Sequence, residues 1–136
     1  MPQNAHSGIK VATIAADQSC PRSIKAAVEA LASWTETEFA RHAGDIASRK
    51  ANGFIREGHG DLHLGNLVLI DGRVTPFDCI EFNEDFRWND PASEIAFVWI
   101  DLLDHGQRGL AAWFLNAWLE TGGDFGALRV LRFYAV

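Results

Sequence analysis

The chain has 136 residues, of which 48% are hydrophobic and 22% charged, with five Trp and nine Phe. A chain of this length buries about two-thirds of its unfolded surface, so we expect one domain over residues 1–136 that needs no disulfide or metal to fold. Its net charge of −6 argues against nucleic acid and anionic membranes as partners, because both require a basic surface.

Cysteine usage and hydropathy favour a cytoplasmic protein. Cys20 and Cys79 are too few for a disulfide framework and lack zinc-site spacing, and Cys79 is predicted to be a small core residue in an apolar run. No stretch reaches the ~18 apolar residues of a membrane span, and residues 9–16 lack the layout of a signal peptide. We therefore expect a cytoplasmic location and no membrane partner.

One long helix is predicted for the N-terminal part of the chain. Residues 1–20 have no clear pattern and are expected to be either poorly ordered or to include a short strand at residues 11–16. Apolar residues recur at helical spacing over residues 23–50, and we expect them to lie in the core. Residues 52–53, Asn-Gly, are the stop signal, and Gly44 marks a place where the helix could be interrupted.

A β-hairpin is predicted directly after a polar loop. Residues 57–66 read EGHGDLHLGN, so ionisable side chains are crowded between glycines. Next, Asp71-Gly72 separates two apolar runs, and this dipeptide is the strongest short-range signal for a two-residue type I′ turn. We therefore expect Leu67–Ile70 and Arg73–Phe77 to pair as antiparallel strands.

The open end of this hairpin gathers oxygen-bearing side chains. A turn at residues 71–72 places Asn66 opposite Phe77 and beside Asp78, with Asp61 in the preceding loop. Such carboxylate and amide oxygens suit Mg²⁺ with bound phosphate. Because side chains alternate along a strand, Asn66 and Asp78 would point to opposite faces of a regular ladder, so at least one of them must lie outside it.

The run HGDLHLGN at residues 59–66, with a second aspartate after the hairpin, resembles the catalytic region of aminoglycoside phosphotransferases and choline kinase-like enzymes, distant relatives of the protein kinases. The runs PFDCIEFN at 76–83 and DPASE at 90–94 resemble a bacterial branch often fused to a P-loop ATP-binding domain. The resemblance covers about residue 31 to the chain end. It implies an α+β, mainly α fold, namely the C-terminal lobe of the protein-kinase-like fold, with a helical core around a central buried helix and a short β-hairpin beside the catalytic loop.

The resemblance also implies a role for each site residue. Asp61 would be the catalytic base, and His63 would lie near the transferred phosphoryl group. Asn66 and Asp78 would bind Mg²⁺ between the phosphates of ATP. His59 would be structural and pack the loop.

Helices are predicted for the rest of the chain. Asp90 suits an N-cap and Pro91 the first helical position. Residues 95–103 are apolar on nearly all sides, so we expect a buried central helix that ends at His105-Gly106. By the resemblance, Asp90 would also brace the catalytic loop by accepting its backbone N–H groups. Two further helices are predicted: residues 110–118, closed by Gly122-Gly123, and residues 125–136.

Acidic residues are concentrated around the predicted site. Between Arg56 and His105 the sequence has eleven Asp and Glu residues but only three Arg. Such a surface repels free ATP and accepts metal-bound nucleotide together with a cationic acceptor. Glu81, Glu84 and Asp85, in the connection after the hairpin, are candidates for binding that acceptor.

These features predict an ATP-dependent phosphotransferase that acts on a hydroxyl of a small molecule such as an amino sugar or amino alcohol. Residues 1–53 contain no glycine-rich nucleotide loop, so we expect a fragment that is inactive without an N-terminal lobe or fused ATP-binding domain, and that self-associates through the uncovered face. Two alternatives stay open. One is a metal-dependent phosphoester hydrolase with His59, Asp61 and His63 as ligands, and the other is a non-catalytic kinase-like binding domain.

Overall fold

A computed structural model describes residues 21–136 of the protein, and this part of the chain is mainly helical. The chain divides into two units, Met1–Arg41 and His42–Val136, and the boundary falls inside the first helix. The second unit adds two two-stranded sheets, so the α+β, mainly α class is confirmed. The predictions for residues 1–20, Cys20 included, lie outside the described residues. None of the described helices is long and apolar enough to cross a membrane.

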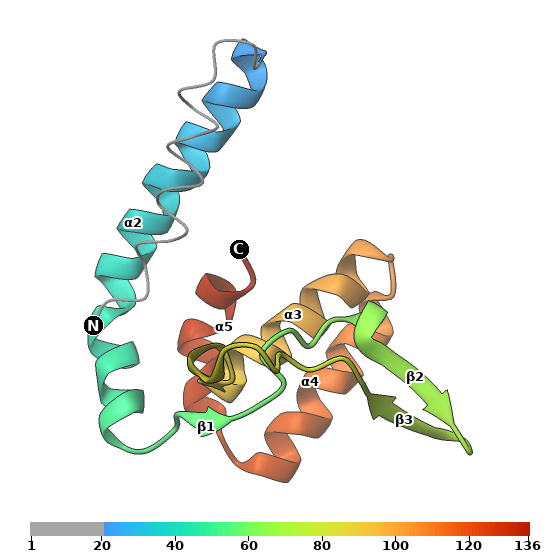
Figure 1. The fold of residues 1–136 in the computed structure, drawn as a ribbon. Helices are drawn as coiled ribbons and strands as arrows, with labels where there is room; N and C mark the ends of the chain where they lie inside the picture. The colour runs from blue at the N-terminus through green and yellow to red at the C-terminus, as the bar shows by residue number, and fades with distance from the viewer. Residues whose placement is uncertain (1–20) are drawn as a thin grey trace. The chain divides into compact units, whose positions relative to one another are not determined.

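Helix α2, Arg22–Ala51, is the predicted long helix (Figure 1), and it passes through Gly44 without interruption. Beyond its C-terminus, Gly53 has a φ of +73°, the left-handed conformation with which glycine commonly ends a helix. The prediction that the apolar residues of this helix lie in the core is wrong for Ile24, Leu31 and Phe39, which are 48%, 45% and 39% exposed.

Strands β2 (Leu67–Ile70) and β3 (Arg73–Pro76) form the predicted hairpin in the predicted register, although β3 ends one residue earlier than expected. The turn residues Asp71 and Gly72 have φ values of +50° and +76°, as a type I′ turn requires. The Asp-Gly dipeptide therefore fixes the pairing, and the hairpin extends away from the helices of its unit (Figure 1).

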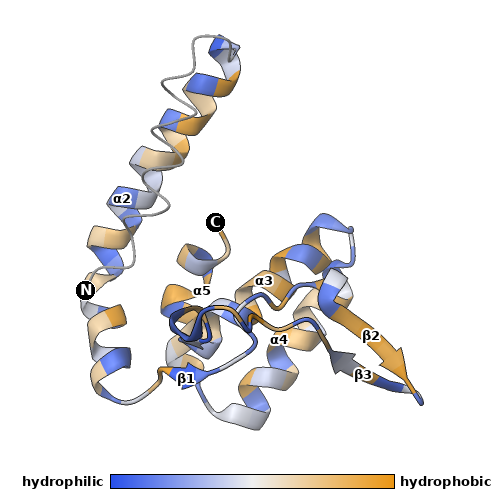
Figure 2. Ribbon diagram, viewed as in Figure 1, coloured by the Kyte–Doolittle hydropathy of each residue, from blue (hydrophilic) through white to orange (hydrophobic). Residues whose placement is uncertain are grey.

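Both faces of this hairpin expose apolar side chains. Leu69 and Val74 are cross-strand partners, and each is 69% exposed. On the other face, Val68 and Ile70 are exposed as well, and Figure 2 shows β2 as an apolar strand. An isolated two-stranded hairpin is at best marginally stable in water. Its position therefore depends on the hydrogen bonds at its open end.

Helix α3, Pro91–Asp104, is the central helix of the second unit. Its N-cap is Asp90, whose carboxylate accepts a hydrogen bond from the Ala92 amide at 3.0 Å, as predicted. It packs against α4 (Arg108–Gly122) and α5 (Leu128–Tyr134) (Figure 1). The shorter elements are strand β1 (Arg56–Glu57), paired with β4 (Trp88–Asn89), and the 3₁₀ turns η1 (Leu64–Asn66), η2 (Glu84–Phe86) and η3 (Phe125–Ala127).

Two small apolar clusters hold these helices together. In the first, Ala92 of α3 packs with Ala127 and Val130. The second cluster consists of Val98, Leu102 and Ala111, and the side chains of Leu62 and Leu64 pack against it. Helix α3 is less enclosed than predicted, because two of its large apolar side chains remain exposed: Phe97 and Ile100.

Candidate functional site

The loop of residues 57–66 is fixed to the chain segment that returns from the hairpin. The Gly58 amide donates a hydrogen bond to the Arg87 carbonyl at 2.8 Å, and the Ile80 amide donates one to the His59 carbonyl at 3.1 Å. Both bonds join segments that are distant in sequence, so the start of the loop is held against residues 80–87.

Glu94 of α3 holds the same loop through its side chain. The Gly60 amide donates to Glu94 Oε1 at 2.6 Å, and Asn89 Nδ2 lies 3.3 Å from the same oxygen. A Cβ at Gly58 would lie 2.8 Å from Glu94 Oε2, and a Cβ at Gly60, whose φ is +86°, would lie 2.9 Å from the Phe86 carbonyl oxygen. Gly60 therefore requires glycine, whereas a side chain at Gly58 would displace the Glu94 carboxylate from the loop.

The prediction that Asp90 braces the loop is wrong. Its carboxylate accepts hydrogen bonds from the Ala92 amide, from Arg49 and, at 3.5 Å, from the Tyr134 hydroxyl. An N-cap carboxylate is committed to the first turn of its own helix, and here Arg49 takes up both oxygens as well. The bracing carboxylate is instead Glu94, one turn further along α3.

Removing the Glu94 carboxylate is expected to loosen the loop. In Glu94→Ala the Gly60 amide loses its acceptor, at a cost of about 1–3 kcal/mol, so its hydrogen exchange should accelerate about tenfold or more. Amide exchange followed by NMR measures this directly. Glu120→Ala, at an exposed position of α4, is the matched control and should leave Gly60 unchanged. Unaltered Gly60 exchange in Glu94→Ala would contradict the role given to this carboxylate.

Asn66 connects the end of the loop to Asp61. Its side chain is buried, and Nδ2 donates to the Asp61 carbonyl oxygen at 2.9 Å and lies 3.5 Å from Asp61 Oδ2. The amide oxygen of Asn66 accepts no hydrogen bond from residues 21–136. The Asp61 side chain is 58% exposed, so its carboxylate is accessible from solvent.

His63 lies beside the Asp61 carboxylate. Its Nε2 is 3.7 Å from Asp61 Oδ2, and its Nδ1 accepts a hydrogen bond from the Gly65 amide at 3.1 Å. In the neutral ring the hydrogen is therefore on Nε2, the nitrogen nearer Asp61. A Cβ at Gly65 would lie 2.8 Å from His63 Cε1, so this glycine leaves room for the ring.

Asp78 is brought next to Asn66 by the open end of the hairpin. The Phe77 amide donates to the Asn66 carbonyl at 3.0 Å, which confirms the predicted pairing of these residues. The Phe77 carbonyl lies 2.7 Å from His59 Nε2, and His59 Nδ1 accepts from the Asp61 amide at 3.4 Å. His59 therefore has the structural role expected of it.

Neither Asn66 nor Asp78 belongs to the regular ladder. Asn66 is the last residue of η1, and Asp78 has a φ of +58°, outside the strand region. The conflict with pleat alternation, which required at least one of them to leave the ladder, is thereby resolved. The Asn66 side chain thus binds the Asp61 carbonyl, and the Asn66 carbonyl binds the amide of Phe77, the residue before Asp78, at the open end of the hairpin.

Other predicted residues lie at the surface. Glu81, Glu84 and Asp85 are all exposed, the last two in η2. The prediction of a core position for Cys79 is wrong, because this free cysteine is exposed. It directly follows Asp78, whose φ of +58° interrupts the extended conformation that an apolar strand would need.

The histidines do not form a metal centre in the part of the chain that the structure describes. Among residues 21–136, no group of three or more His, Cys, Asp or Glu side chains is arranged to hold a metal ion. Both ring nitrogens of His59 are engaged in hydrogen bonds. This arrangement disfavours the ligand set of His59, Asp61 and His63.

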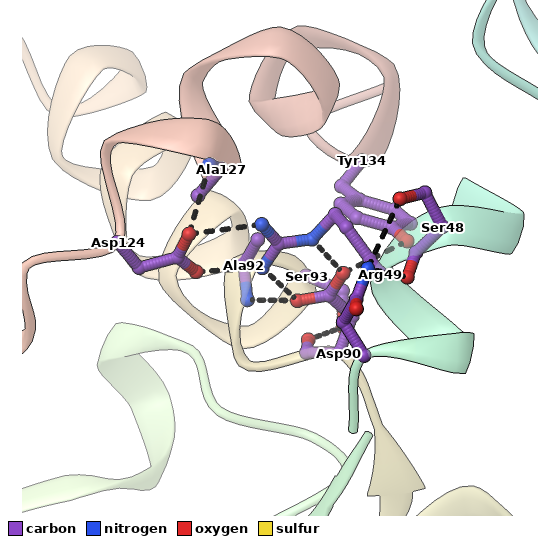
Figure 3. Close-up of polar contacts among 9 residues, drawn as sticks. Ser48, Arg49, Asp90, Ala92, Ser93, Asp124, Ala127 and Tyr134 are labelled. Atoms are coloured by element: carbon purple, nitrogen blue, oxygen red, sulfur yellow. Dashed lines mark hydrogen bonds and ion pairs between the residues drawn. The ribbon is translucent and has the colours of Figure 1, made fainter. Parts of the chain in front are cut away.

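A buried ionic cluster lies at the N-terminus of α3, and sequence reasoning missed it. The Arg49 guanidinium donates to Asp90 from Nε at 2.5 Å and from Nη2 at 2.8 Å, and to Asp124 at 2.9 and 2.6 Å (Figure 3). Its Cζ lies 4.3 Å from the centre of the Phe54 ring. Arg49 and Asp90 are 6% and 4% exposed, so this cluster joins the end of α2 to the start of α3 without solvent between them.

The cluster shifts the pKa of its members. The hydrogen bonds from Arg49 hold the pKa of Asp124 below its usual value despite burial, and hydrogen bonds to Asp90 and Asp124 raise the pKa of Arg49. Burial, together with the charge of Asp90, raises the pKa of Tyr134 to about 12. Arg49 therefore stays charged at any pH at which the protein is folded.

These shifts predict how stability depends on pH. The depressed pKa of Asp124 contributes stability that is present above its unfolded pKa of about 4 and is lost as pH falls through the folded value. The raised pKa of Tyr134 contributes stability that is complete below about pH 10 and is lost as pH rises through about 12. Denaturant unfolding from pH 2 to 12 measures both limbs. Asp124→Asn should flatten the acid limb and Tyr134→Phe the alkaline limb; unchanged limbs would contradict the assignments.

The fold and the site define a mainly helical protein with an acidic loop–hairpin site. No protein-family model matches the chain, and no solved structure matches it. It is similar to an uncharacterized protein of Mycobacterium bovis and to uncharacterized proteins of two Mycobacterium tuberculosis strains, each 33% identical over 89 residues. The match covers 65% of this chain but 18% of each relative, so the chain spans less than a fifth of the length of these relatives.

Proposed function

We propose that this chain is the C-terminal lobe of a protein-kinase-like phosphotransferase, related to the aminoglycoside phosphotransferases and choline kinase-like enzymes. The observation that carries the proposal is the hydrogen bonding of Asn66, which binds the Asp61 carbonyl through its side chain and the Phe77 amide through its backbone. These two bonds link Asn66 to the proposed base and to the residue before Asp78, the second aspartate, and this linkage supports a site in which the three residues act together in phosphoryl transfer.

In the proposed reaction Asp61 is the general base. Its exposed carboxylate accepts the proton of a small-molecule hydroxyl while the hydroxyl oxygen bonds to the γ-phosphorus of ATP. The bond from that phosphorus to the bridging oxygen breaks, and ADP leaves with the bridging oxygen. His63, with its Nε2 hydrogen near Asp61, donates a hydrogen bond to the phosphoryl group in transit. Positioning and charge neutralisation account for most of the rate enhancement in such reactions.

Two oxygen donors fit a magnesium ion at the open end of the hairpin. The Asn66 amide oxygen accepts no hydrogen bond from any of the residues that the structure describes. Asp78, which follows the Asn66-paired residue Phe77, has an exposed carboxylate. One or two protein oxygens are enough, because Mg²⁺ keeps phosphate oxygens and water as its other ligands. When bound, the ion neutralises phosphate charge.

The remaining parts of the enzyme belong to the proposal as well. The relatives are several times longer than the matched region. This length supports an additional N-terminal lobe or fused ATP-binding domain that supplies the nucleotide site. The proposed location of the whole enzyme is the cytoplasm. A cationic acceptor such as an amino sugar or amino alcohol suits the exposed acids Glu81, Glu84 and Asp85. The exposed apolar hairpin supports self-association of the isolated chain.

The test is phosphoryl transfer by the longer natural protein. We expect Mg²⁺-dependent ADP release in the presence of a pooled set of amino sugars, amino alcohols and sugars, and little or none from the 136-residue chain alone. Lack of turnover together with lack of any thermal shift by Mg-nucleotide would overturn the proposal in favour of a non-catalytic domain. Metal-dependent hydrolysis of a phosphoester without nucleotide would instead favour the hydrolase.

A further inference from the structure

The loop of residues 57–66 docks on α3 through two leucines on either side of His63. Leu62 and Leu64 pack against the cluster that contains Val98 and Leu102. His63 itself is extended, with φ −131° and ψ 171°, and in an extended chain successive side chains point to opposite sides. The two leucines therefore face the helices, while the imidazole faces away from them, toward Asp61.

Asp101 of α3 lies beside the residues that receive these leucines. It is three residues after Val98 and directly before Leu102, on the helix face that receives the leucines. Its Oδ2 accepts a hydrogen bond from the Leu64 amide at 2.9 Å. A carboxylate acceptor makes a stronger bond to a backbone N–H than a neutral group does. The peptide unit between His63 and Leu64 is therefore tied to α3 by a charge-assisted bond.

Two hydrogen bonds then orient the imidazole. The Leu64 amide bound to Asp101 sets the backbone of His63, and the Gly65 amide bound to His63 Nδ1 sets the ring orientation and tautomer. Asp101 thus binds the first amide of η1, and His63 binds the second. If the peptide unit before Leu64 rotates, the Gly65 amide and Nδ1 no longer meet.

We propose that Asp101 is a positioning residue that acts through His63, keeping Nε2–H of the imidazole directed at the Asp61 carboxylate and the phosphoryl group. This inference rests on the proposed function for its effect on rate, but the effect on His63 is independent of it. Nothing in the HGDLHLGN motif indicates the residue, because Asp101 follows the motif by 35 positions or more.

Amide exchange in the 136-residue chain tests the positioning without any assay of activity. In Asp101→Ala we expect the exchange of both Leu64 and Gly65 amides to accelerate about tenfold or more, although Asp101 contacts only the first. Asp101→Asn retains an acceptor oxygen and should restore most of the protection. Asp104→Ala, one turn further at an exposed position of α3, should leave both amides unchanged. Faster exchange at Leu64 with Gly65 unaltered would overturn the inference, because Asp101 would then be merely structural.

Kinetics of the longer natural protein test the consequence for the reaction. We expect Asp101→Ala to lower kcat by up to about 10²-fold with the KM for ATP nearly unchanged, and Asp101→Asn to recover most of the loss. An equal kcat for Asp101→Ala and wild type would overturn the positioning role. If the wild type itself does not turn over, the proposed function fails while the exchange result still decides the effect on His63. If Asp101→Ala does not fold, Asp101→Ser replaces it in both measurements. The serine side chain is too short for its hydroxyl to reach the Leu64 amide.

Discussion

Replacing Asp61 with Asn is expected to lower kcat of the longer natural protein by about 10²–10⁴-fold, the usual contribution of a general base. The amide of Asn cannot accept the hydroxyl proton, but it has the same shape as the carboxylate. The backbone carbonyl of residue 61, which binds the Asn66 side chain, is unaffected. ADP release in the presence of the acceptor pool measures the loss, and the KM for ATP should change little.

The control for this substitution is Asp71→Asn at the tip of the hairpin. Asp71 is also exposed, and its φ of +50° is a conformation that Asn adopts readily. The same change of charge away from the site should leave kcat unaltered. Thermal unfolding should show that both variants are as stable as the wild type, because the Asp61 side chain is largely exposed. Full activity of Asp61→Asn would disprove the assignment of the base.

Replacing Arg49 with Ala is expected to destabilise the fold by about 3–5 kcal/mol, the usual cost of removing one partner of a buried ion pair. Asp90 would keep its buried position, at 4% exposure, without a positive charge beside it, and Asp124 would lose two hydrogen bonds. Denaturant unfolding at neutral pH measures the change in the free energy of unfolding. Arg49→Lys should be nearly as damaging, since a single ammonium cannot replace a planar fork that binds two carboxylates.

Arg41→Ala is the matched control on the same helix. Arg41 forms an ion pair with Glu38, and its side chain is 64% exposed, so its loss should cost about 0–1 kcal/mol. Both substitutions remove a positive charge and change helix propensity in the same way, but only Arg49→Ala removes a buried cluster. The difference between their free energies of unfolding therefore reports the contribution of the cluster. A change of less than about 1 kcal/mol in Arg49→Ala would show that the cluster does not stabilise the fold.

Local signals explain the parts of the fold that could be predicted from the sequence. The Asp71-Gly72 dipeptide requires positive φ at both positions, and this alone determines the register that delivers Asn66 to Phe77. In the same way, Asp90 followed by Pro91 determines the first turn of α3. Each of these predictions depends on residues within a few positions of one another, where the geometry of the chain leaves little choice.

The residues that hold the site in place depend on contacts that no local pattern encodes. Arg49 binds partners that follow it by 41 and 75 positions, and in the sequence it resembles any basic residue in the last turn of a helix. Glu94 and Asp101 are separated by about two turns, so they lie on one face of α3. That spacing could have indicated a polar face of α3 that binds the loop. The apolar residues between them instead favour a helix enclosed on nearly all sides.

The left-handed backbone at Asp78 limits which amino acids can occupy that position. A φ of +58° is accessible to Gly, Asn and Asp but strains a residue with a bulky or branched Cβ. Alanine substitution there would combine loss of a carboxylate with backbone strain, so the two effects could not be told apart. Asparagine removes the negative charge and keeps both the torsion angle and one oxygen. For this reason the chirality of the chain, as much as its chemistry, restricts natural variation and useful mutagenesis at the second aspartate.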